Sequence, residues 1–512
     1  MRALLSVYDK TGLIPFAQGL AALKVDMIAS GNTSAALKEA GIDHVDVATV
    51  TGSPEMLGGR VKTLHPKIHG GILADRSKAE HLEDLAANNI DAIDLVVCNL
   101  YPFTSNPSIE LIDVGGPTMV RAAAKNHAHV GIVVNPEDYE VVLAELQQQG
   151  ALSDGTRATL ARKAFAHTAA YDAAIATWMS QGGADGLSRE ADPTLPEHLA
   201  LSLTRAEVLR YGENPHQRGA RYRIDGAESF WDHVQQHAGT GLSYLNLFDA
   251  DAAWRLAFEL SADAEGRPAA AIIKHANACG AAVADSIAEA FASALQADPM
   301  SAFGGIVALS VPIDAELART IAEGPQADVI IAPALSAEAI DILVARRKAT
   351  RLLSAPLPER SEIQIRSLGN SMLVQSFDHF ESTPSTWKVV TQRQPTTQEW
   401  EDMVIAWRVC GRTTSNAIAL TREGRAVGIG AGQQSRVVAA EIAVNKAQVN
   451  ATGAAGASDA FFPFPDGLEV LIAAGVTAIV QPGGSVRDDE VTAVADAAGI
   501  TMVHTGERHF RH

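Results

Sequence analysis

One nine-residue segment, 272–280, brings together more kinds of reactive side chain than any other part of the chain. Lys274, His275, Asn277 and Cys279 follow an apolar run typical of a buried strand. Catalytic groups favour such strand ends, because a rigid sheet aims them while the following loop leaves them accessible. A lysine beside a histidine is also suited to proton transfer. A solvated strand end with a structural cysteine is an equally good interpretation of these residues alone.

Two polar loops near the N-terminus have residues suited to bind a phosphate. Segment 6–12 carries hydroxyls, a lysine and a glycine after one apolar run, and segment 30–34 (Ser-Gly-Asn-Thr-Ser) follows the next. Free amides at helix N-termini attract anions, and loops after adjacent parallel strands meet at the carboxyl edge of a sheet. Each loop alone is explained more simply as a helix cap, and the first lacks the spaced glycines of a Walker A loop.

A basic cluster in segment 60–71 reverses the charge of an otherwise acidic chain. Its basic or titratable side chains are Arg60, Lys62, His65, Lys67 and His69. Such a cluster favours a phosphate or a developing oxyanion, with a solvated basic loop as the alternative. Pro66 argues against a helical zinc-binding pair of the two histidines.

Two further fragments carry groups that would act on an amide. Asn99 and Tyr101 end an apolar run, and Asp113 precedes a glycine pair that opens a predicted helix containing Lys125. A glycine pair before a helix lets its amides approach an anion closely. An aspartate, a tyrosine and two lysines at one sheet edge would orient an amide and stabilise a tetrahedral oxyanion. Tyr101 by itself is better explained as a half-buried phenol.

The second part of the chain contains four more candidate binding segments: 210–217, 300–305, 430–436 and 458–466. The first is a polar turn suited to a purine-like ring or a phosphate. The next two are glycine turns, and the second of them lacks the spacing of a dinucleotide-binding loop. The last holds three of the 14 phenylalanines. It is either a core plug or an aromatic wall for a flat ring, with Asp466 pairing to ring nitrogens.

Strands and helices are expected to alternate along the chain and to position these groups. Such alternation predicts α/β architecture with parallel strands. The strands expected in the first part are 3–7, 25–29, 95–99 and 130–134, followed by a long amphipathic helix over 157–178. Those expected in the second part are 270–273, 306–309, 329–331, 426–429 and 478–480. Periodicity breaks at 181–196, so we predict domains at 1–195 and 196–512. A segment rich in Pro, Ser and Thr at 355–398 predicts two subdomains in the second, and we find no fixed-period repeat.

The composition narrows the function classes. A chain of 512 residues is too long for one core, and a formal net charge of −19 argues against binding to nucleic acid or an anionic membrane. Three widely spaced cysteines predict no disulfide framework and fit a reducing compartment. The apolar N-terminus is interrupted at Tyr8, and the apolar stretch 470–480 is too short to span a bilayer. We expect a cytoplasmic protein with no membrane partner.

Taken together and in this order, the motifs resemble the bifunctional purine-biosynthesis family that joins IMP cyclohydrolase to AICAR formyltransferase. The resemblance covers essentially the whole chain. It implies an N-terminal methylglyoxal-synthase-like parallel-sheet domain, followed by a formyltransferase region of two cytidine-deaminase-like subdomains. It also implies a homodimer with shared transferase sites and 10-formyltetrahydrofolate as co-substrate. No metal is expected, and a bound monovalent cation is left open.

The resemblance assigns roles to residues of both regions. In the cyclohydrolase it implies the catalytic residues Lys62, Tyr101, Asp113 and Lys125, and nucleotide binding by Ser6, Lys10, Thr11, Ser30, Gly31, Thr33, Arg60, Thr63 and Asn99. In the transferase it implies the catalytic pair Lys274 and His275, and a nucleotide site of Arg210, Tyr211, His216, Phe303, Asp328, Asn416 and Arg436. The folate side would be formed by Met300, Phe461, Pro463, Asp466, Ser485 and Arg508.

Three positions depart from the family pattern without removing a catalytic group. Ala278 replaces a proline, Asn32 replaces a glycine and Tyr8 stands where serine is common. Asparagine tolerates a left-handed backbone, so Asn32 is compatible with the loop. Ala278 loosens the loop after His275, and Tyr8 changes how the first phosphate loop contacts its ligand.

The resemblance implies the last two steps of IMP synthesis. The 5-amino group of AICAR takes the formyl group of 10-formyltetrahydrofolate, with His275 accepting a proton and Lys274 assisting the oxyanion or the leaving nitrogen. The product FAICAR then closes with loss of water, which requires mainly orientation. One alternative is a transferase whose N-terminal domain only binds an effector. A zinc deaminase is disfavoured, because the P-C-x-x-C pair of metal ligands does not occur.

Overall fold

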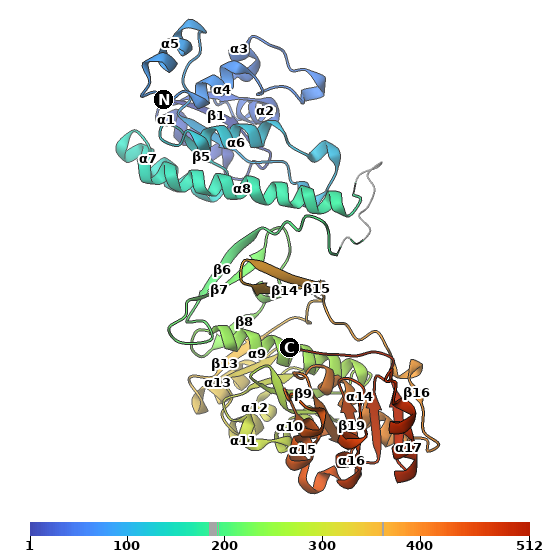
Figure 1. The fold of residues 1–512 in the computed structure, drawn as a ribbon. Coiled ribbons are helices and arrows are strands. Elements are labelled where there is room, and N and C mark those ends of the chain that lie inside the picture. The colour runs from blue at the N-terminus through green and yellow to red at the C-terminus, as the bar shows by residue number, and fades with distance from the viewer. Residues whose placement is uncertain (184–191, 193, 361–362) are drawn as a thin grey trace. The chain divides into compact units, whose positions relative to one another are not determined.

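The structure, a computed structural model, describes residues 1–183, 192, 194–360 and 363–512 (Figure 1). Part of the segment in which the sequence predicts the main domain boundary, 184–191 and 193, lies outside the described residues. By internal contacts the chain divides into two units. Unit 1 is Met1–Thr204 with Ile224–Ala227, and unit 2 is Arg205–Arg223 with Glu228–His512.

Unit 1 is built on a five-stranded parallel sheet in the order β3-β2-β1-β4-β5. Its strands are β1 (Arg2–Ser6), β2 (Asp26–Ala29), β3 (Val45–Asp46), β4 (Leu95–Cys98) and β5 (Gly131–Val133). The four strands predicted from apolar runs are confirmed. The two-residue β3 was missed, because so short a strand has no alternation to detect.

Helices cover both faces of this sheet, because successive strand residues point to opposite sides. Leu5 and Val97 pack with α1 and α7 in one buried cluster, whereas Leu4 and Val96 pack with α4 and α6 in another. The helices of unit 1 are α1 (Leu13–Ala22), α2 (Gly31–Glu39), α3 (Val47–Thr51), α4 (Pro66–Leu73), α5 (Ala79–Ala87), α6 (Gly115–Lys125), α7 (Tyr139–Gln149) and α8 (Asp154–Ser180).

The long helix expected over 157–178 is confirmed as α8, 27 residues long. Its N-cap Ser153 accepts a hydrogen bond from the Thr156 amide, and it buries a stripe that includes Leu160, Ala164 and Thr168. Further along the same helix, the Tyr171 hydroxyl bonds to the loop that leads into α6. This helix therefore supports both the core of unit 1 and one of its polar loops.

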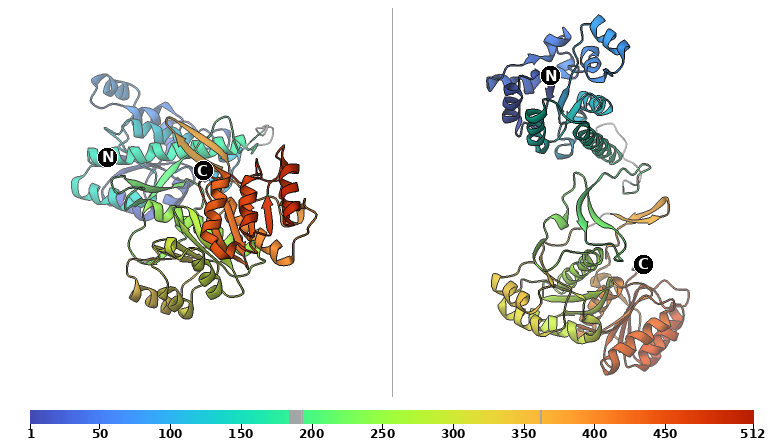
Figure 2. Two further views of the ribbon diagram at one scale, coloured as in Figure 1. Left: turned by 60° about the horizontal axis from the view of Figure 1, so that its bottom comes forward. Right: turned by 90° about the vertical axis from the view of Figure 1, so that its left-hand side faces the viewer.

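Unit 2 contains one sheet of twelve strands, in the order β16-β21-β20-β19-β17-β18-β10-β9-β11-β12-β13-β8. Figure 2 shows this unit, coloured from green to red, in two further views. One half consists of β8 (Gln235–Ala238), β9 (Ala269–Lys274), β10 (Asn277–Val283), β11 (Ile306–Leu309), β12 (Val329–Ala332) and β13 (Arg351–Ser354). The other consists of β16 (Lys388–Val389), β17 (Ile418–Arg422), β18 (Arg425–Gly430), β19 (Ala455–Ser458), β20 (Ala478–Gln481) and β21 (Thr501–His504). All five strands predicted in this part are confirmed.

The two halves of the sheet repeat the same succession of elements, although the sequence shows no periodic repeat. Each half has an edge strand, a long helix, an antiparallel hairpin, and then three parallel strands separated by helices. The halves meet where β10 pairs antiparallel with β18, Ala282 opposite Arg425. The strand directions of one half are therefore reversed in the other.

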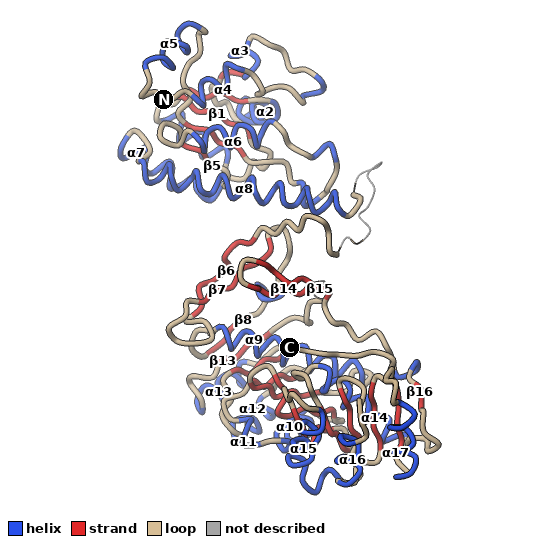
Figure 3. The backbone as a smooth tube through the Cα atoms, in the orientation of Figure 1, coloured by secondary structure: helices blue, strands red, loops and turns tan. Residues whose placement is uncertain are grey.

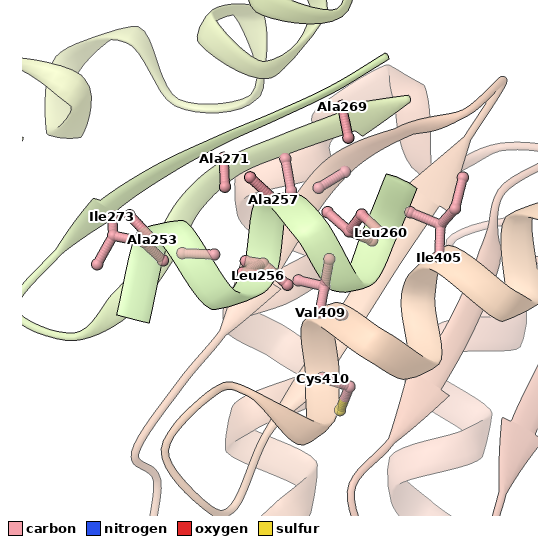
Figure 4. Packing of buried hydrophobic residues seen from close by; sticks show 14 of the residues in the cluster. Ala253, Leu256, Ala257, Leu260, Ala269, Ala271, Ile273, Ile405, Val409 and Cys410 are labelled. Atoms are coloured by element: carbon pink, nitrogen blue, oxygen red, sulfur yellow. The ribbon is translucent and has the colours of Figure 1, made fainter. Parts of the chain in front are cut away.

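The helices of unit 2 lie on the faces of its sheet (Figure 3). The first half contributes α9 (Tyr244–Asp263), α10 (Ile287–Ala297), α11 (Pro299–Ala302), α12 (Ala315–Glu323) and α13 (Ala337–Arg346). The second contributes α14 (Thr397–Gly411), α15 (Arg436–Ala447), α16 (Asp466–Ala473) and α17 (Asp488–Ala498). The equivalent helices α9 and α14 pack together under the sheet, where Leu256 and Leu260 share a cluster with Ile405 and Val409 (Figure 4).

Two short hairpins stand outside the large sheets. One pairs β6 (Leu203–Leu209) with β7 (Gly219–Ile224). The other pairs β14 (Ile363–Leu368) with β15 (Ser371–Ser376) within the segment 355–398, for which the sequence predicted only a division. No helix among the described residues is long and apolar enough to cross a membrane.

Candidate active sites

A cleft of about 980 Å³ opens in unit 1 at the carboxyl ends of β1, β2 and β4. The central strand β1 has neighbours on both sides, which is where open α/β sheets bind ligands. The structure brings eleven of the thirteen residues predicted for this region to the cleft: Ser6, Lys10, Ser30, Gly31, Thr33, Arg60, Lys62, Thr63, Asn99, Tyr101 and Asp113. We call it the unit 1 cleft.

Two predicted ligand residues also hold the loops of this cleft in place. The Thr33 hydroxyl exchanges hydrogen bonds of 3.0 Å with the backbone amide and carbonyl of Val7. The Asn99 side chain accepts from the amides of Tyr8 and Asp9 and donates to the Asp9 carbonyl. Both side chains thereby fix the loop after β1.

The floor of the cleft has free donors for an anion. Ser30 and Ser6 approach within 3.1 Å through their hydroxyls, and Ser30 makes no side-chain cap to α2, the helix that it opens. The uncapped first turn of α2 therefore presents its amides and its dipole to the cleft.

Two cations of the cleft are paired with acids that the sequence interpretation did not single out. Lys62 forms an ion pair with Glu55, and Arg60 forms one with Glu110. All four side chains are partly or largely exposed, so solvent screens both pairs. An incoming phosphate can therefore displace either acid at small cost.

Asp113 and Tyr101 both line the cleft and both have raised pKa values. Burial raises the pKa of the Asp113 carboxyl, although the Gly116 amide donates to it at 2.9 Å. Burial and then the Asp113 charge raise the pKa of the Tyr101 phenol. The pair thus places a carboxyl group beside a phenol in the cleft. The Tyr171 hydroxyl accepts from the Asp113 amide at 2.9 Å and fixes its loop.

The other two predicted residues do not line the cleft. Thr11 is exposed and donates to the Asp9 carboxylate from both its amide and its hydroxyl, which lowers the pKa of Asp9. Lys125 is exposed at the last position of α6, whereas the first residue of that helix lies in the cleft. At 1.5 Å per residue, the length of α6 separates the two by about 15 Å.

In unit 2, most of the predicted transferase residues gather along one edge of the twelve-stranded sheet. The register places the end of β9 beside the starts of β11, β12 and β13. It also places the start of β17 beside the ends of β18 and β19. The Thr414 amide donates to the Asn277 side chain at 2.8 Å and links the two sets. We call this the Lys274 edge, and it carries Lys274, His275, Phe303, Asp328, Asn416, Arg436, Phe461, Pro463 and Ser485.

At this edge the Lys274–Asn277 turn joins β9 to β10 by a two-residue connection. His275 and Ala276 both have positive φ, 55° and 56°, the combination that a type I′ hairpin turn requires. The Lys274 ammonium donates to the Phe303 carbonyl at 2.9 Å, while His275 is exposed. The turn therefore directs a free imidazole and a tethered lysine to the same edge.

A buried acid on α9 supports this turn and was missed by the sequence interpretation. The Asp249 carboxylate accepts from the amides of His275 at 3.1 Å and Ala276 at 2.8 Å. Its only sequence signal is an acid in an apolar helix, which does not tell a buried position from an exposed one. The Arg511 guanidinium, also missed, donates to the Ala276 carbonyl at 3.0 Å.

Arg436 lies in a buried polar network and not on the open surface. It donates to Asn416 at 2.7 Å and to the Ser458 hydroxyl at 2.8 Å, and it forms an ion pair with the fully buried Asp459. Removal of one member would leave another buried and unpaired, which is costly. Arg436 therefore orients Asn416, and Asp459 is a further residue that the sequence interpretation missed.

Three of the predicted folate residues, Phe461, Pro463 and Ser485, lie on loops after β19 and β20. Gln481 at the end of β20 accepts from the Phe462 amide at 2.9 Å, so the two loops run side by side. Phe462 is the core plug, only 1% exposed, while Phe461 is half-buried and Phe464 is exposed. Both interpretations of this phenylalanine-rich segment thus apply, each to different rings.

Other predicted residues on the folate side are accessible. Met300 is 88% exposed on α11, next to Phe303, which is 61% exposed. Asp466 begins α16 and accepts from the Gly467 amide, and the Arg508 guanidinium lies 4.5 Å from the Phe510 ring centroid. These elements therefore supply exposed apolar and charged side chains, the two kinds that a ligand with a flat ring and a carboxylate requires.

The predicted nucleotide turn at 210–217 approaches the start of α9. The Arg210 amide donates to the Leu242 carbonyl and the Tyr244 amide donates to the Tyr211 carbonyl, so this turn lies about one and a half helical turns from Asp249. The Arg210 guanidinium lies 5.5 Å from the Tyr211 ring centroid, and His216 is exposed.

Cys279, although close to Lys274, has a structural role. It is buried, its thiol lies 3.4 Å from the Ile272 carbonyl, and burial raises its pKa to about 11. A protonated, inaccessible thiol is a poor nucleophile. No group of three or more His, Cys, Asp or Glu side chains that could hold a metal occurs among the described residues.

Comparisons with known proteins relate this chain to a purine-biosynthesis enzyme family. The AICARFT/IMPCHase bienzyme model matches residues 123–446, and the MGS-like domain model matches 12–127. The bifunctional purine biosynthesis protein PurH of Halalkalibacterium halodurans is 47% identical over 523 residues, covering 100% of this chain and 99% of that protein. The crystal structure of ForH, 41% identical, covers 34% of this chain and 97% of its own with a TM-score of 0.32.

These matches include both units and leave no large part of the chain unaccounted for. They agree with the methylglyoxal-synthase-like parallel sheet of unit 1 and with the α/β architecture of unit 2. The chain belongs to the AICARFT/IMPCHase bienzyme family.

Proposed function

We propose that the two activities of this family are divided between the two sites described above. The enzyme transfers a formyl group to AICAR and then closes FAICAR to IMP. We assign formyl transfer to the Lys274 edge and ring closure to the unit 1 cleft. The observation that carries this assignment is that each site gathers its own set of proton donors and acceptors. A purely effector-binding role for unit 1 does not account for the Asp113–Tyr101 pair.

In formyl transfer, the 5-amino nitrogen of AICAR attacks the formyl carbon of 10-formyltetrahydrofolate. The new carbon–nitrogen bond creates a tetrahedral oxyanion, and the amine must lose a proton. The exposed His275 imidazole is suited to accept that proton. The Lys274 ammonium, held by the Phe303 carbonyl, is suited to stabilise the oxyanion or protonate the leaving folate nitrogen. Collapse then yields FAICAR and tetrahydrofolate.

In ring closure, the carboxamide nitrogen of FAICAR attacks its own formyl carbon, and the former formyl oxygen leaves as water. The Asp113 carboxylate would accept the proton from the carboxamide nitrogen. Tyr101 and Lys62 would donate to the oxygen that develops charge. Because both reacting groups belong to one molecule, a fixed orientation supplies much of the rate. We leave Lys125 out of this centre because of its position on α6.

The nucleotide phosphate would bind among the loops after β1 and β2. Ser6, Lys10, Ser30 and the free amides of α2 provide hydroxyl, ammonium and backbone donors there. Lys62 and Arg60 would exchange Glu55 and Glu110 for the ligand. This accounts for an anion site in a protein whose overall charge is strongly negative.

We further propose a homodimer that works in the cytoplasm with small-molecule partners and no nucleic acid. The β14–β15 hairpin exposes Ile365, Leu368, Met372 and Leu373, which are 39% to 65% accessible. A second copy of this chain is the partner expected to cover them. Three buried free cysteines fit a reducing compartment. Sedimentation equilibrium of the wild type and of a Leu368→Lys, Leu373→Lys variant tests the dimer.

The division of labour is tested with purified enzyme, AICAR and 10-formyltetrahydrofolate, with separate assays for tetrahydrofolate and IMP. Lys274→Ala should abolish tetrahydrofolate release and still close supplied FAICAR. Lys62→Ala should release tetrahydrofolate and accumulate FAICAR. Equal loss of both activities in either variant would contradict the assignment.

A further inference from the structure

The Asp249 carboxylate is hydrogen-bonded to the turn that carries His275. It accepts both amide hydrogens of the turn, from His275 and Ala276, and Asp249 itself is only 8% exposed. Among the described residues, no other two adjacent non-glycine residues both have positive φ. Left-handed backbone is unfavourable for residues with a Cβ, and it persists only where the surroundings impose it. The two hydrogen bonds that Asp249 accepts from the turn provide that constraint.

The other half of the sheet contains the same arrangement of an aspartate and a two-residue turn. Asp402 on α14 accepts from the amides of Glu423 at 3.0 Å and Gly424 at 2.8 Å, which form the two-residue connection from β17 to β18. Asp249 and Asp402 are each six residues beyond the helix N-cap, and both N-caps form a capping box. Burial raises the pKa of both carboxyls, and the two turn amides oppose that shift in each. The two aspartates are structural equivalents.

The two turns differ in what they present. Because β10 and β18 run antiparallel, the Glu423–Gly424 turn lies at the opposite end of the strands from the Lys274 edge. It carries Arg422 and Glu423 where the other carries Lys274 and His275. Glycine at 424 also adopts positive φ without strain, whereas the equivalent Ala276 does not. The second turn thus has the aspartate support without the reactive side chains.

We propose that Asp249 is a positioning residue for formyl transfer, which sets the direction of the His275 imidazole by holding the strained His275–Ala276 turn. This inference rests on the proposed role of His275. Turnover then depends on the backbone geometry of the turn as well as on the histidine side chain. Asp402 holds an equivalent turn that does not take part in the reaction.

Asparagine at position 249 would remove one of the two hydrogen bonds from the turn with little change in side-chain shape. Its side chain offers one acceptor oxygen and one NH2 donor, so one turn amide would face a donor. The turn would relax, and His275 would move relative to the formyl carbon. A displacement of about 1 Å is enough to lower a rate by roughly 100-fold.

The experiment compares Asp249→Asn with its matched control Asp402→Asn in the full-length enzyme. We expect Asp249→Asn to lower kcat for formyl transfer by about 10- to 100-fold, with KM for AICAR changed less than about threefold and closure of supplied FAICAR unchanged. Asp402→Asn should lower the melting temperature by a similar amount and keep kcat within about twofold. The double variant Asp249→Asn, Ala276→Gly should recover part of kcat, because glycine accepts positive φ unaided.

Equal falls in kcat for the two asparagine variants, or a kcat for Asp249→Asn within twofold of the wild type, would overturn the proposal. So would a double variant no more active than Asp249→Asn alone. If Asp249→Asn does not fold, the same comparison is made between Asp249→Ser and Asp402→Ser, which keep a hydroxyl acceptor. His275→Ala is assayed in parallel. Full activity of that variant would refute the proposed role of His275 itself, whatever the aspartate variants show.

Discussion

The ammonium nitrogen of Lys62 lies 3.0 Å from the point where a Cβ on Gly31 would stand. Gly31 also has a φ of 48°, in the left-handed region. The absence of a side chain at this first residue of α2 therefore lets the lysine approach the uncapped helix terminus. The basic cluster predicted at 60–71 and the loop predicted at 30–34 are brought together by this contact.

Gly31→Ala should therefore impair ring closure. The new methyl group would displace the Lys62 ammonium and strain the start of α2. We expect kcat/KM for FAICAR to fall by about 10- to 100-fold, while formyl transfer at the Lys274 edge stays within about twofold. Separate steady-state assays of the two reactions measure this. Loss of formyl transfer to the same extent would point to misfolding and not to a displaced lysine.

The two lysines assigned to the cyclohydrolase by resemblance should behave differently. Lys62→Ala removes a donor from the cleft and should lower kcat for ring closure by roughly 100-fold or more. Lys125→Ala, at the far end of α6, should keep kcat within about threefold, with a small loss of stability because a cation leaves the helix C-terminus. A comparable loss of ring closure in both variants would return Lys125 to the catalytic centre.

Ring closure should depend on the ionisation of Asp113. Since burial raises the pKa of this carboxyl, the acidic limb of kcat for FAICAR should have its midpoint above the ordinary aspartate value of 3.8. Activity should rise with pH through that midpoint. For an acid whose folded pKa is raised, the ionised form opposes folding. The free energy of unfolding of the wild type should therefore fall relative to that of Asp113→Asn as the pH rises through the same midpoint. Chemical denaturation at several pH values checks the sign.

Two glycines at equivalent positions of the repeat should be intolerant of a side chain. A Cβ on Gly280 would lie 1.9 Å from the Ala294 carbonyl oxygen of α10, and one on Gly428 would lie 2.0 Å from the Ala443 carbonyl oxygen of α15. Alanine at either position should lower the free energy of unfolding by about 1–3 kcal/mol or more, since a helix must move. Gly155→Ala on α8, where a Cβ would meet only the Ser153 hydroxyl, at 4.0 Å, is the control. Thermal unfolding of the three variants measures the difference.

The cysteines should be unreactive in the folded enzyme. All three are buried, and burial raises the pKa of each thiol, that of Cys279 to about 11. A thiol reagent near pH 8 should label three cysteines in denaturant and essentially none in the native protein. Rapid native labelling accompanied by loss of formyl transfer would contradict a structural role for Cys279.

The elements that the sequence predicted well were those with a strong local pattern. Buried strands such as β4 and β12 are unbroken apolar runs, and α8 has a long apolar stripe. The β14–β15 hairpin was missed, although Gly369-Asn370 at its turn is a recognised hairpin signal. The internal repeat was missed because its halves share strand order and supporting contacts, not a residue period.

The candidate residues were predicted through motifs, so residues that act from elsewhere in the chain were missed. Asp249 and Asp459 are acids within apolar surroundings, and only the folded contacts show what they hold. Glu55 and Glu110 are ordinary surface acids until the cleft brings them to Lys62 and Arg60. Lys125, which the resemblance alone places in the cyclohydrolase centre, lies at the last position of α6, whereas the first residue of that helix lines the cleft.

The continuity of the twelve-stranded sheet limits how unit 2 can respond to its ligands. Its halves share the β10–β18 pairing and the packing of α9 against α14, which the partly buried ion pairs Arg408–Asp263 and Arg412–Glu259 reinforce. Two halves joined in this way do not undergo a hinge-type domain closure around a substrate. Selectivity for a nucleotide and a pterin must then arise from preformed rims and from short loops that adjust locally, so inhibitors shaped to the resting enzyme should already fit.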